Sequence, residues 1–117
     1  MQVPSMLNDK TRNNAETPTI RRWRVVEVEK QDGERSRHIW GHDVTNDRGR
    51  ASTAIQEFDR ETMIATTRRG SSYKLVGAPG NSLVLETVWR TWCRLHGVVS
   101  EVDVTNEYFD IDRLISS

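Results

Sequence analysis

Histidine is the side chain in this sequence best suited to acid–base chemistry or metal binding, and two of the three histidines, His38 and His42, lie on one predicted strand. They share a face of that strand with Trp40. Positions i and i+4 of a strand are about 13 Å apart because each residue rises about 3.3 Å, whereas zinc holds each ligand nitrogen at about 2 Å. A metal site would need Asp43 or His96 to join from another element. The spacing favours structural histidines, and we predict no metal ion.

The single cysteine, Cys93, is a candidate nucleophile with His96 or His42 as its base. On the predicted helix Cys93 stands three residues before His96, where the two side chains are only neighbours. It borders an apolar stripe, and a lone cysteine in such a place usually behaves as a small buried hydrophobic residue. Arg90 and Arg94 could lower the pKa of the thiol, but they are equally well explained as residues of the solvent-exposed face of the helix. We therefore predict a structural role for Cys93.

Paired carboxylates could act as general acid and base, and the candidates are Glu57 with Asp59 and Asp103 with Glu107. Neither pair stands in a recognisable pocket-forming motif. An enzyme would instead need a histidine to converge with a carboxylate in a concave site. We predict no catalytic residue and no cofactor, and an enzyme of unknown class is the third of three functional hypotheses.

Arginines interleaved with aromatic residues form the richest candidate set, since fourteen of the seventeen basic residues are arginine. Arginine makes bidentate contacts with carboxylates and phosphates, and Arg, Trp and Tyr are enriched at interface hot spots. The predicted binding residues are Trp23, Arg35, Arg37, Trp40, Arg48, Arg50, Arg68, Arg69 and Tyr73. The alternative interpretation is an ordinary solvated sheet in which glutamates such as Glu27 and Glu29 are cross-strand partners of the arginines.

These residues favour a small non-enzymatic interaction module over an enzyme. The leading hypothesis is that it binds another protein, as an inhibitor or accessory factor, through the Arg- and Trp-bearing sheet or the acidic C-terminal segment. Trp89 and Trp92 fit the core, which leaves Trp23 and Trp40 as interface candidates. The alternative is a nucleic-acid-binding domain in which the turn arginines contact phosphates and the sheet aromatics stack on bases. The sequence pI near 6.8 is low for such a domain.

Charge is balanced over the whole chain but not along it. Residues 21–80 carry twelve basic and nine acidic side chains, and residues 81–117 carry three basic and six acidic ones. The opposite signs indicate either internal complementarity, with the C-terminal part folding back on the basic sheet, or two faces for different partners. No apolar run approaches the roughly 18–20 residues of a membrane span. With no signal peptide and one unpaired cysteine, a bacterial-type cytoplasmic protein without membrane contact is expected.

The elements that must position these residues form one predicted domain, residues 21–117, after a polar tail of residues 1–20. The sheet covers residues 21–78. Its strands are predicted at residues 23–29, 35–44, 52–58, 62–67 and 72–76, and the Asp-Gly turn between the first two is typical of a β-hairpin. Gly70 can supply the positive φ of the last hairpin turn.

A helix is predicted over residues 82–96, capped by Asn81 or Ser82 and ended by Gly97. Its apolar stripe consists of Leu85, Val88, Trp89, Trp92 and Leu95. Residues 98–117 are predicted to form an edge strand, through which a homodimer could assemble, and an acidic tail. The fold class is therefore α+β. We predict an antiparallel meander of five to six strands, as a curved sheet or small partly open barrel, covered by one C-terminal amphipathic helix.

Overall fold

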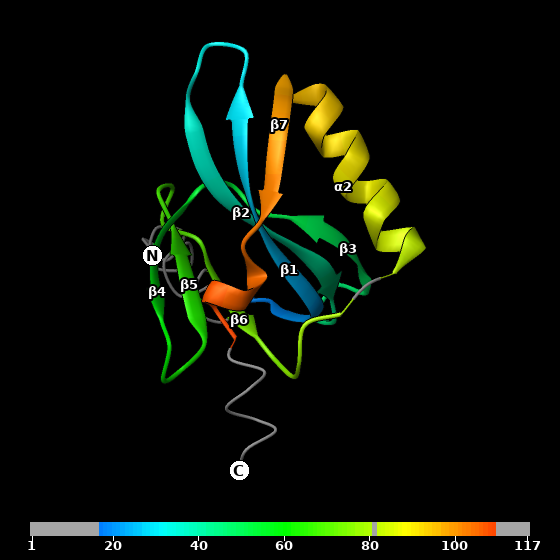
Figure 1. Cartoon of the computed structure of the whole chain (residues 1–117). Helices are drawn as coiled ribbons and strands as arrows, with labels where there is room; N and C mark the ends of the chain where they lie inside the picture. Colours follow the sequence, from blue (N-terminus) through cyan, green and yellow to red (C-terminus); the bar gives the residue numbers. More distant parts are fainter. Residues whose placement is uncertain (1–16, 81, 110–117) are drawn as a thin grey trace, which may run out of the picture.

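The longest strand in the computed structural model, which describes residues 17–80 and 82–109, is β1 (Thr19–Lys30) (Figure 1). One edge of β1 pairs antiparallel with β2 (Arg35–Asp43). The other edge is divided: its N-terminal end pairs in parallel with β6 (Ser72–Leu75), and its C-terminal half pairs antiparallel with β7 (Val98–Asp103). The pairing with β2 is interrupted by a bulge at Arg22, which has a φ of 52°. Because a bulge bends a strand, β1 can pair with β6 at one end of its second edge and with β7 at the other.

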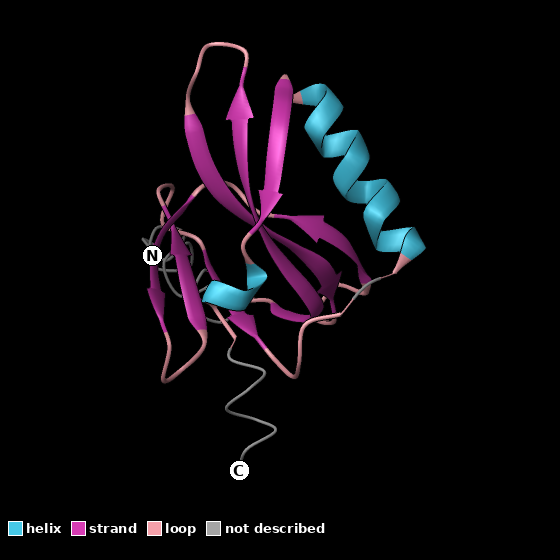
Figure 2. Ribbon diagram, in the orientation of Figure 1, coloured by secondary structure: helices cyan, strands magenta, loops and turns pink. Residues whose placement is uncertain are grey.

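Three shorter strands complete a seven-stranded sheet in the order β3-β2-β1-β6-β5-β4, with β7 beside β1 (Figure 2). They are β3 (Arg48–Ala51), β4 (Ile55–Asp59) and β5 (Ile64–Thr67). The predicted α+β class is confirmed, with an open and mostly antiparallel sheet. The strand that the sequence pattern did not predict is β3, which lies between the predicted strands 35–44 and 52–58. The order is not a simple meander, because β6 adds in parallel to the edge of β1.

The folded domain begins before residue 21. Ile20 lies in β1, is 1% exposed, and pairs with Asp43 on one side and Leu75 on the other. The rest of the predicted tail, residues 1–16, lies outside the described residues. Among the described residues β3, β4 and β7 each have one edge without a strand partner. A homodimer through such an edge stays a prediction.

The helix α2 (Leu83–Leu95) covers one face of the sheet, as predicted (Figure 1). The hydroxyl of Ser82 accepts a hydrogen bond from the backbone N–H of Leu85, and Gly97 follows the helix with a φ of 69°. These are the expected N-cap and C-terminal glycine. Leu95 is 74% exposed, so the buried face of α2 is shorter than the predicted stripe and ends at Cys93, two residues before the end of the helix.

Two hydrophobic clusters lie on opposite faces of the β1–β2 hairpin. One packs β1 and β2 against β5 and β6 and consists of Ile20, Trp23, Val25, Ile39, Ala65, Tyr73, Leu75 and Val104. The other packs the sheet against α2 and consists of Val26, Val28, Trp40, Leu85, Trp89 and Cys93. Neighbouring residues of a strand point to opposite faces, so β1 is apolar at successive positions because both of its faces are covered.

Trp23 and Trp40, which were predicted as interface residues, belong to these two hydrophobic clusters. Trp23 is 0% exposed and Trp40 is 6% exposed, whereas Trp92, expected in the core, is only partly buried. The indole N–H of Trp23 donates to the backbone carbonyl of Gly77 at 3.0 Å. The expectation of exposed tryptophans on the sheet is thus corrected. The charged neighbours of Trp23 in the sequence do not place it at the surface, because the cluster that β1 and β2 form with β5 and β6 buries its ring.

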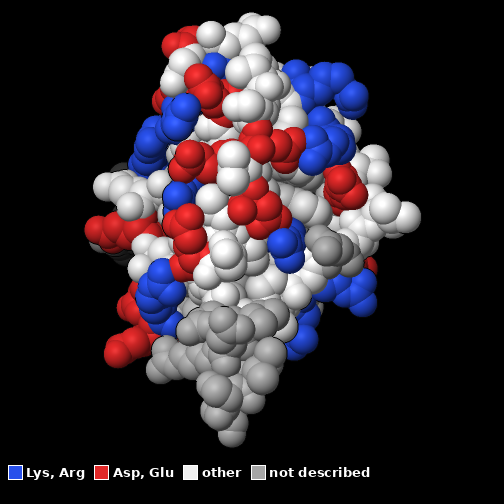
Figure 3. Space-filling view, in the orientation of Figure 1, with Lys and Arg blue, Asp and Glu red and all other residues white. Residues whose placement is uncertain are grey.

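Acidic residues near the C-terminus pair with arginines of the sheet. The guanidinium of Arg24 lies 2.9 Å from Asp103, and that of Arg37 lies 2.9 Å from Glu107. These pairs confirm the predicted internal complementarity. Figure 3 accordingly shows red and blue side chains interleaved on this face rather than one continuous field. Within the described residues, no helix has the length and hydropathy needed to cross a membrane.

Candidate binding site

The three histidines lie in separate environments. The Nδ1 atom of His38 is 2.9 Å from the carbonyl of Ser52, and its Nε2 atom is 2.7 Å from the hydroxyl of Ser36. His42 contacts Asp47 at 3.1 Å. His96 stacks on Trp92, with ring centroids 4.2 Å apart. In the described ranges no three His, Cys, Asp or Glu side chains are grouped closely enough to hold a metal ion.

Burial lowers the pKa of His38 below its ordinary value of 6.5, and nearby Lys30, His96 and Arg68 act in the same direction. The neutral ring satisfies both contacts, since Nδ1–H donates to the Ser52 carbonyl and Nε2 accepts from the Ser36 hydroxyl. His38 is therefore a neutral, hydrogen-bonded and buried residue.

We expect His38 to make stability depend on pH. The unfolded chain takes up a proton near the ordinary histidine pKa while the folded chain does not, so the free energy of unfolding should fall as the pH is lowered from about 7 to about 5, by up to about 1.4 kcal/mol per pH unit. The aspartates whose pKa is lowered, Asp43, Asp59 and Asp103, act only at lower pH. Urea denaturation at a series of pH values measures the free energy of unfolding, which should depend less on pH in His38→Gln than in the wild type. An equally steep pH dependence in His38→Gln and the wild type would contradict this assignment.

Cys93 and Asp59, one of the candidate carboxylates, are in structural environments. Burial raises the pKa of the Cys93 thiol to about 11, with Glu101 adding to the effect, so the thiol stays protonated. The carboxylate of Asp59 accepts hydrogen bonds from the backbone N–H groups of Glu61 and Thr62, which lowers its pKa. Such a carboxylate is held ionised as a turn cap and is a poor proton donor.

Arg50 and Tyr73, two of the predicted binding residues, are part of the interior. Asp43 is completely buried, and its carboxylate accepts from the Nε of Arg50 at 2.8 Å and from Asn46 at 2.8 Å. The guanidinium of Arg50 also lies over the ring of Tyr73, 5.8 Å from its centroid, and Tyr73 is 6% exposed. Arg50 is thus held by contacts within the fold, to Asp43 and to Tyr73. Arg48, by contrast, is exposed on β3.

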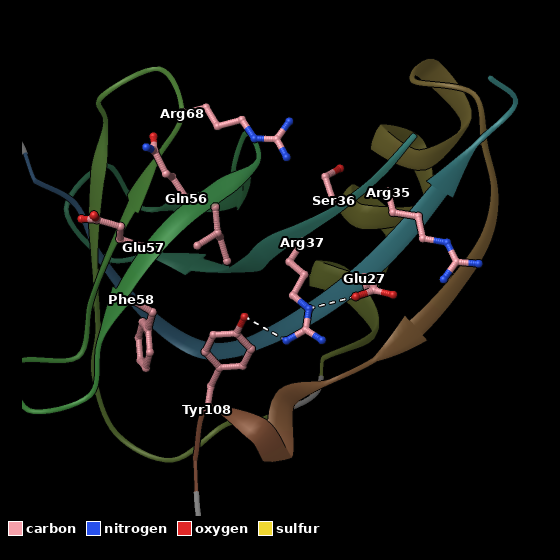
Figure 4. A pocket seen from close by; sticks show the side chains of 10 residues that line it. Glu27, Arg35, Ser36, Arg37, Gln56, Glu57, Phe58, Arg68 and Tyr108 are labelled. Carbon is pink, nitrogen blue, oxygen red and sulfur yellow. Dashed lines mark hydrogen bonds and ion pairs between the residues drawn. The ribbon is translucent and has the colours of Figure 1, made fainter. Parts of the chain in front are cut away.

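Three other predicted arginines line one hollow, which we call the β2 cleft (Figure 4). Arg35 and Arg37 come from β2, and Arg68 comes from the turn between β5 and β6. The cleft has a volume of about 340 Å³. Its lining consists of Glu27, Arg35, Ser36, Arg37, Ile55, Gln56, Glu57, Phe58, Arg68 and Tyr108. Segments that are distant in the sequence therefore form a single basic and aromatic hollow.

Arg37 is the fixed member of the three arginines. Its guanidinium donates to Glu27 at 3.0 Å, to Glu107 at 2.9 Å and to the hydroxyl of Tyr108 at 3.2 Å. The hydrogen bond to Tyr108 makes the largest contribution to raising the pKa of Arg37, and those to the two glutamates add to it. Arg37 thus anchors the segment that follows β7 against β2, and it supplies a wall of the cleft rather than a free charge.

Arg35 and Arg68 are the accessible members. Each has one long contact to a glutamate, Arg35 to Glu29 at 3.4 Å and Arg68 to Glu34 at 3.5 Å, and their side chains are 66% and 54% exposed. Pairs of this kind contribute little to stability because both partners remain in water. Their guanidinium groups can therefore exchange these partners for groups of a ligand.

A second hollow of about 260 Å³ adjoins the first, and we call it the Trp92 cleft. The two clefts share Ser36 and Arg68. The lining of the Trp92 cleft consists of Lys30, Glu34, Ser36, His38, Thr53, Ala54, Arg68, Arg69, Trp92 and His96. Of the predicted binding residues, Arg35, Arg37, Arg68 and Arg69 thus gather around two adjoining clefts, while Trp23, Trp40, Arg48, Arg50 and Tyr73 line neither.

Sequence reasoning missed the aromatic walls of these clefts. Trp92 was assigned to the core because it lies on the apolar stripe of α2, and Tyr108 was assigned to an acidic tail. Their roles depend on how α2 and the segment after β7 dock on β2, which no local pattern encodes. Phe58 was expected only as a member of a strand. Comparison with protein-family models, with curated proteins and with solved structures found no match.

Proposed function

We propose that this chain is a protein-binding module that holds an extended, acidic segment of a partner protein along the β2 and Trp92 clefts. The observation that supports it is that Arg35, Arg37 and Arg68 line one hollow together with the aromatic rings of Phe58 and Tyr108 (Figure 4). Arginine and aromatic side chains are the residue types that dominate interface energies. A role as inhibitor or accessory factor fits such a module, and the unpaired Cys93 fits action in a reducing compartment such as the cytoplasm.

The shape of the site favours an extended segment. Each cleft is of a size that takes one or two side chains, and the shared residues Ser36 and Arg68 make the clefts neighbours along a single path. Phe58 and Tyr108 offer apolar surface at one end and Trp92 at the other. A peptide can place apolar side chains on these aromatic rings while its carboxylates meet the exposed arginines between them.

The charge pattern favours a protein partner over nucleic acid. Glu27, Glu57 and Glu34 lie among the arginines of the same clefts, so the positive charge is interrupted and does not form the continuous track that a chain of phosphates needs. The aromatic residues that we expected to stack on bases, Trp23, Trp40 and Tyr73, are buried. A polypeptide with mixed side chains can match alternating charges, whereas a nucleic-acid backbone cannot.

Affinity capture from a lysate tests this function. The tagged protein should retain a specific protein after nuclease treatment. Raising the salt from about 0.05 M to about 0.3 M should reduce the captured amount, because salt screens the contacts between carboxylates and exposed arginines, but should not abolish it, because apolar contacts are screened little. Loss of all captured material on nuclease treatment, or a steep loss with salt, would instead support nucleic-acid binding. Identification of the captured protein by mass spectrometry provides the partner for the variants described below.

A further inference from the structure

One carboxylate of the chain already lies between two cations of the Trp92 cleft. The Oε1 atom of Glu34 is 3.8 Å from the Nζ of Lys30, and its Oε2 atom is 3.5 Å from a terminal nitrogen of Arg68. A single anionic group at this position therefore reaches both cations at once. Arg69 lines the same cleft and forms no ion pair with any residue in the described ranges.

We propose that the Trp92 cleft is a binding site for a phosphate monoester, carried as a phosphorylated serine or threonine on the partner segment, and that Glu34 is the internal anion that occupies it until the partner binds. This inference rests on the proposed function and specifies the ligand chemistry of the same site. The site is a cleft of about 260 Å³ with three cationic side chains, Lys30, Arg68 and Arg69, along its lining.

The charge of the cleft matches a phosphate better than a carboxylate. Lys30, Arg68 and Arg69 with Glu34 leave two net positive charges. A phosphate monoester carries about −1.5 to −2 at neutral pH and has three acceptor oxygens, whereas a carboxylate carries a single charge. Arginine forks and a lysine ammonium together can satisfy the three oxygens, which is how arginine clusters recognise phosphorylated motifs elsewhere.

Other residues form the remaining walls of the cleft. Thr53 lines it and is exposed, so its hydroxyl is available as a hydrogen-bond donor. The ring of His96 lies nearly parallel to that of Trp92, at 16°, and its Nδ1 atom donates to the Trp92 carbonyl at 2.8 Å. His96 and Trp92 thus form a stacked aromatic wall beside the three cations.

Glu34 is placed so that it can leave the cleft. It follows the Asp-Gly turn of the β1–β2 hairpin, its side chain is 49% exposed, and both of its ion-pair distances exceed those of strong charge-assisted hydrogen bonds. A group with more charge and more acceptor oxygens can displace it. Because Glu34 competes for the same cations, its removal should strengthen phosphate binding.

Chemical-shift titration tests the site without the partner. The probe is a glycine-flanked peptide with one phosphoserine, compared with the same peptide carrying serine or glutamate. The phosphopeptide should shift the Trp92 indole N–H and the Thr53 and Arg69 amides saturably, with a dissociation constant of about 1 mM. Glu34→Gln should tighten binding at least about threefold, Arg68→Gln should weaken it at least about tenfold, and Arg48→Gln should leave it unchanged.

Three results would overturn the proposal. They are equal shifts with the serine and phosphoserine peptides, no tightening in Glu34→Gln, and tighter binding of a single-stranded oligothymidine than of the phosphopeptide at the same residues. If the captured partner still binds in the β2 cleft while the phosphopeptide does not bind, the phosphate inference fails and the protein-binding function stands. If the phosphopeptide binds at this cleft but the lysate yields no protein, the phosphate site stands and the proposed function fails.

Discussion

Replacement of Trp23 by alanine is expected to lower the free energy of unfolding by about 3–5 kcal/mol, a large share of the roughly 5–15 kcal/mol that holds a domain of this kind together. The ring is fully buried in the cluster between β1 and β6, and it meets the edge of Phe109 with centroids 6.0 Å apart. Its removal would leave a cavity and would also strand the Gly77 carbonyl that accepts from the indole.

Chemical denaturation of purified variants measures this effect. Trp92→Ala is the matched control, because it removes the same side chain from a partly exposed position and should cost less. If Trp23→Ala does not fold, Trp23→Phe keeps most of the apolar volume and should still lose about 1–3 kcal/mol through the missing hydrogen bond and the smaller ring. A loss at Trp23 no larger than that at Trp92 would contradict the assignment of Trp23 to the core.

Charge reversal at Arg68 is expected to weaken binding of the captured partner at least about tenfold, which corresponds to about 1.4 kcal/mol. Arg68 is the one arginine that lines both clefts, and its side chain is about half exposed. Arg68→Glu removes an attraction for the acidic segment and adds a repulsion in the same place. The fold should tolerate the change, because the only ion pair of Arg68 with a described residue is the long contact to Glu34.

Titration of the purified partner against each variant measures the loss, and Arg48→Glu provides the control. Arg48 is an exposed sheet arginine that lines neither cleft, so its reversal makes the same change in net charge elsewhere on the molecule. Equal weakening by Arg48→Glu and Arg68→Glu would indicate a general charge effect rather than a site. An unchanged dissociation constant in Arg68→Glu would contradict the proposed groove.

Local patterns in the sequence predicted the parts of this fold whose signals are local. The Asp-Gly turn gave the β1–β2 hairpin, and the serine cap, apolar spacing and glycine gave α2. The burial of Trp23 and Trp40 was not predictable in this way. It depends on β1 being covered on both faces, so that Trp23 is buried although charged residues flank it in the sequence.

The same distinction between local and long-range information applies to the candidate site. Residue type identified Arg35, Arg37, Arg68 and Arg69 as candidates, but nothing in their spacing indicated that the turn after β5 would reach β2. Arg50 carried the same signal as Arg68, yet it is tied to the buried Asp43. Its role depends on the pairing of β3 with β2. β3 was not predicted, because the glycine and the two arginines at residues 48–50 are not typical of a strand.

Site-specific photo-crosslinking tests the location of partner binding most directly. A photoreactive residue at Gln56, which is exposed and lines the β2 cleft, should cross-link to the captured partner, and the same residue at Arg48 should not. Excess phosphoserine peptide, which is expected to occupy the Trp92 cleft, should leave cross-linking from Gln56 in the β2 cleft detectable. Efficient cross-linking from position 48 with none from position 56 would contradict the account, because the partner would then bind a face of the sheet remote from the converging arginines.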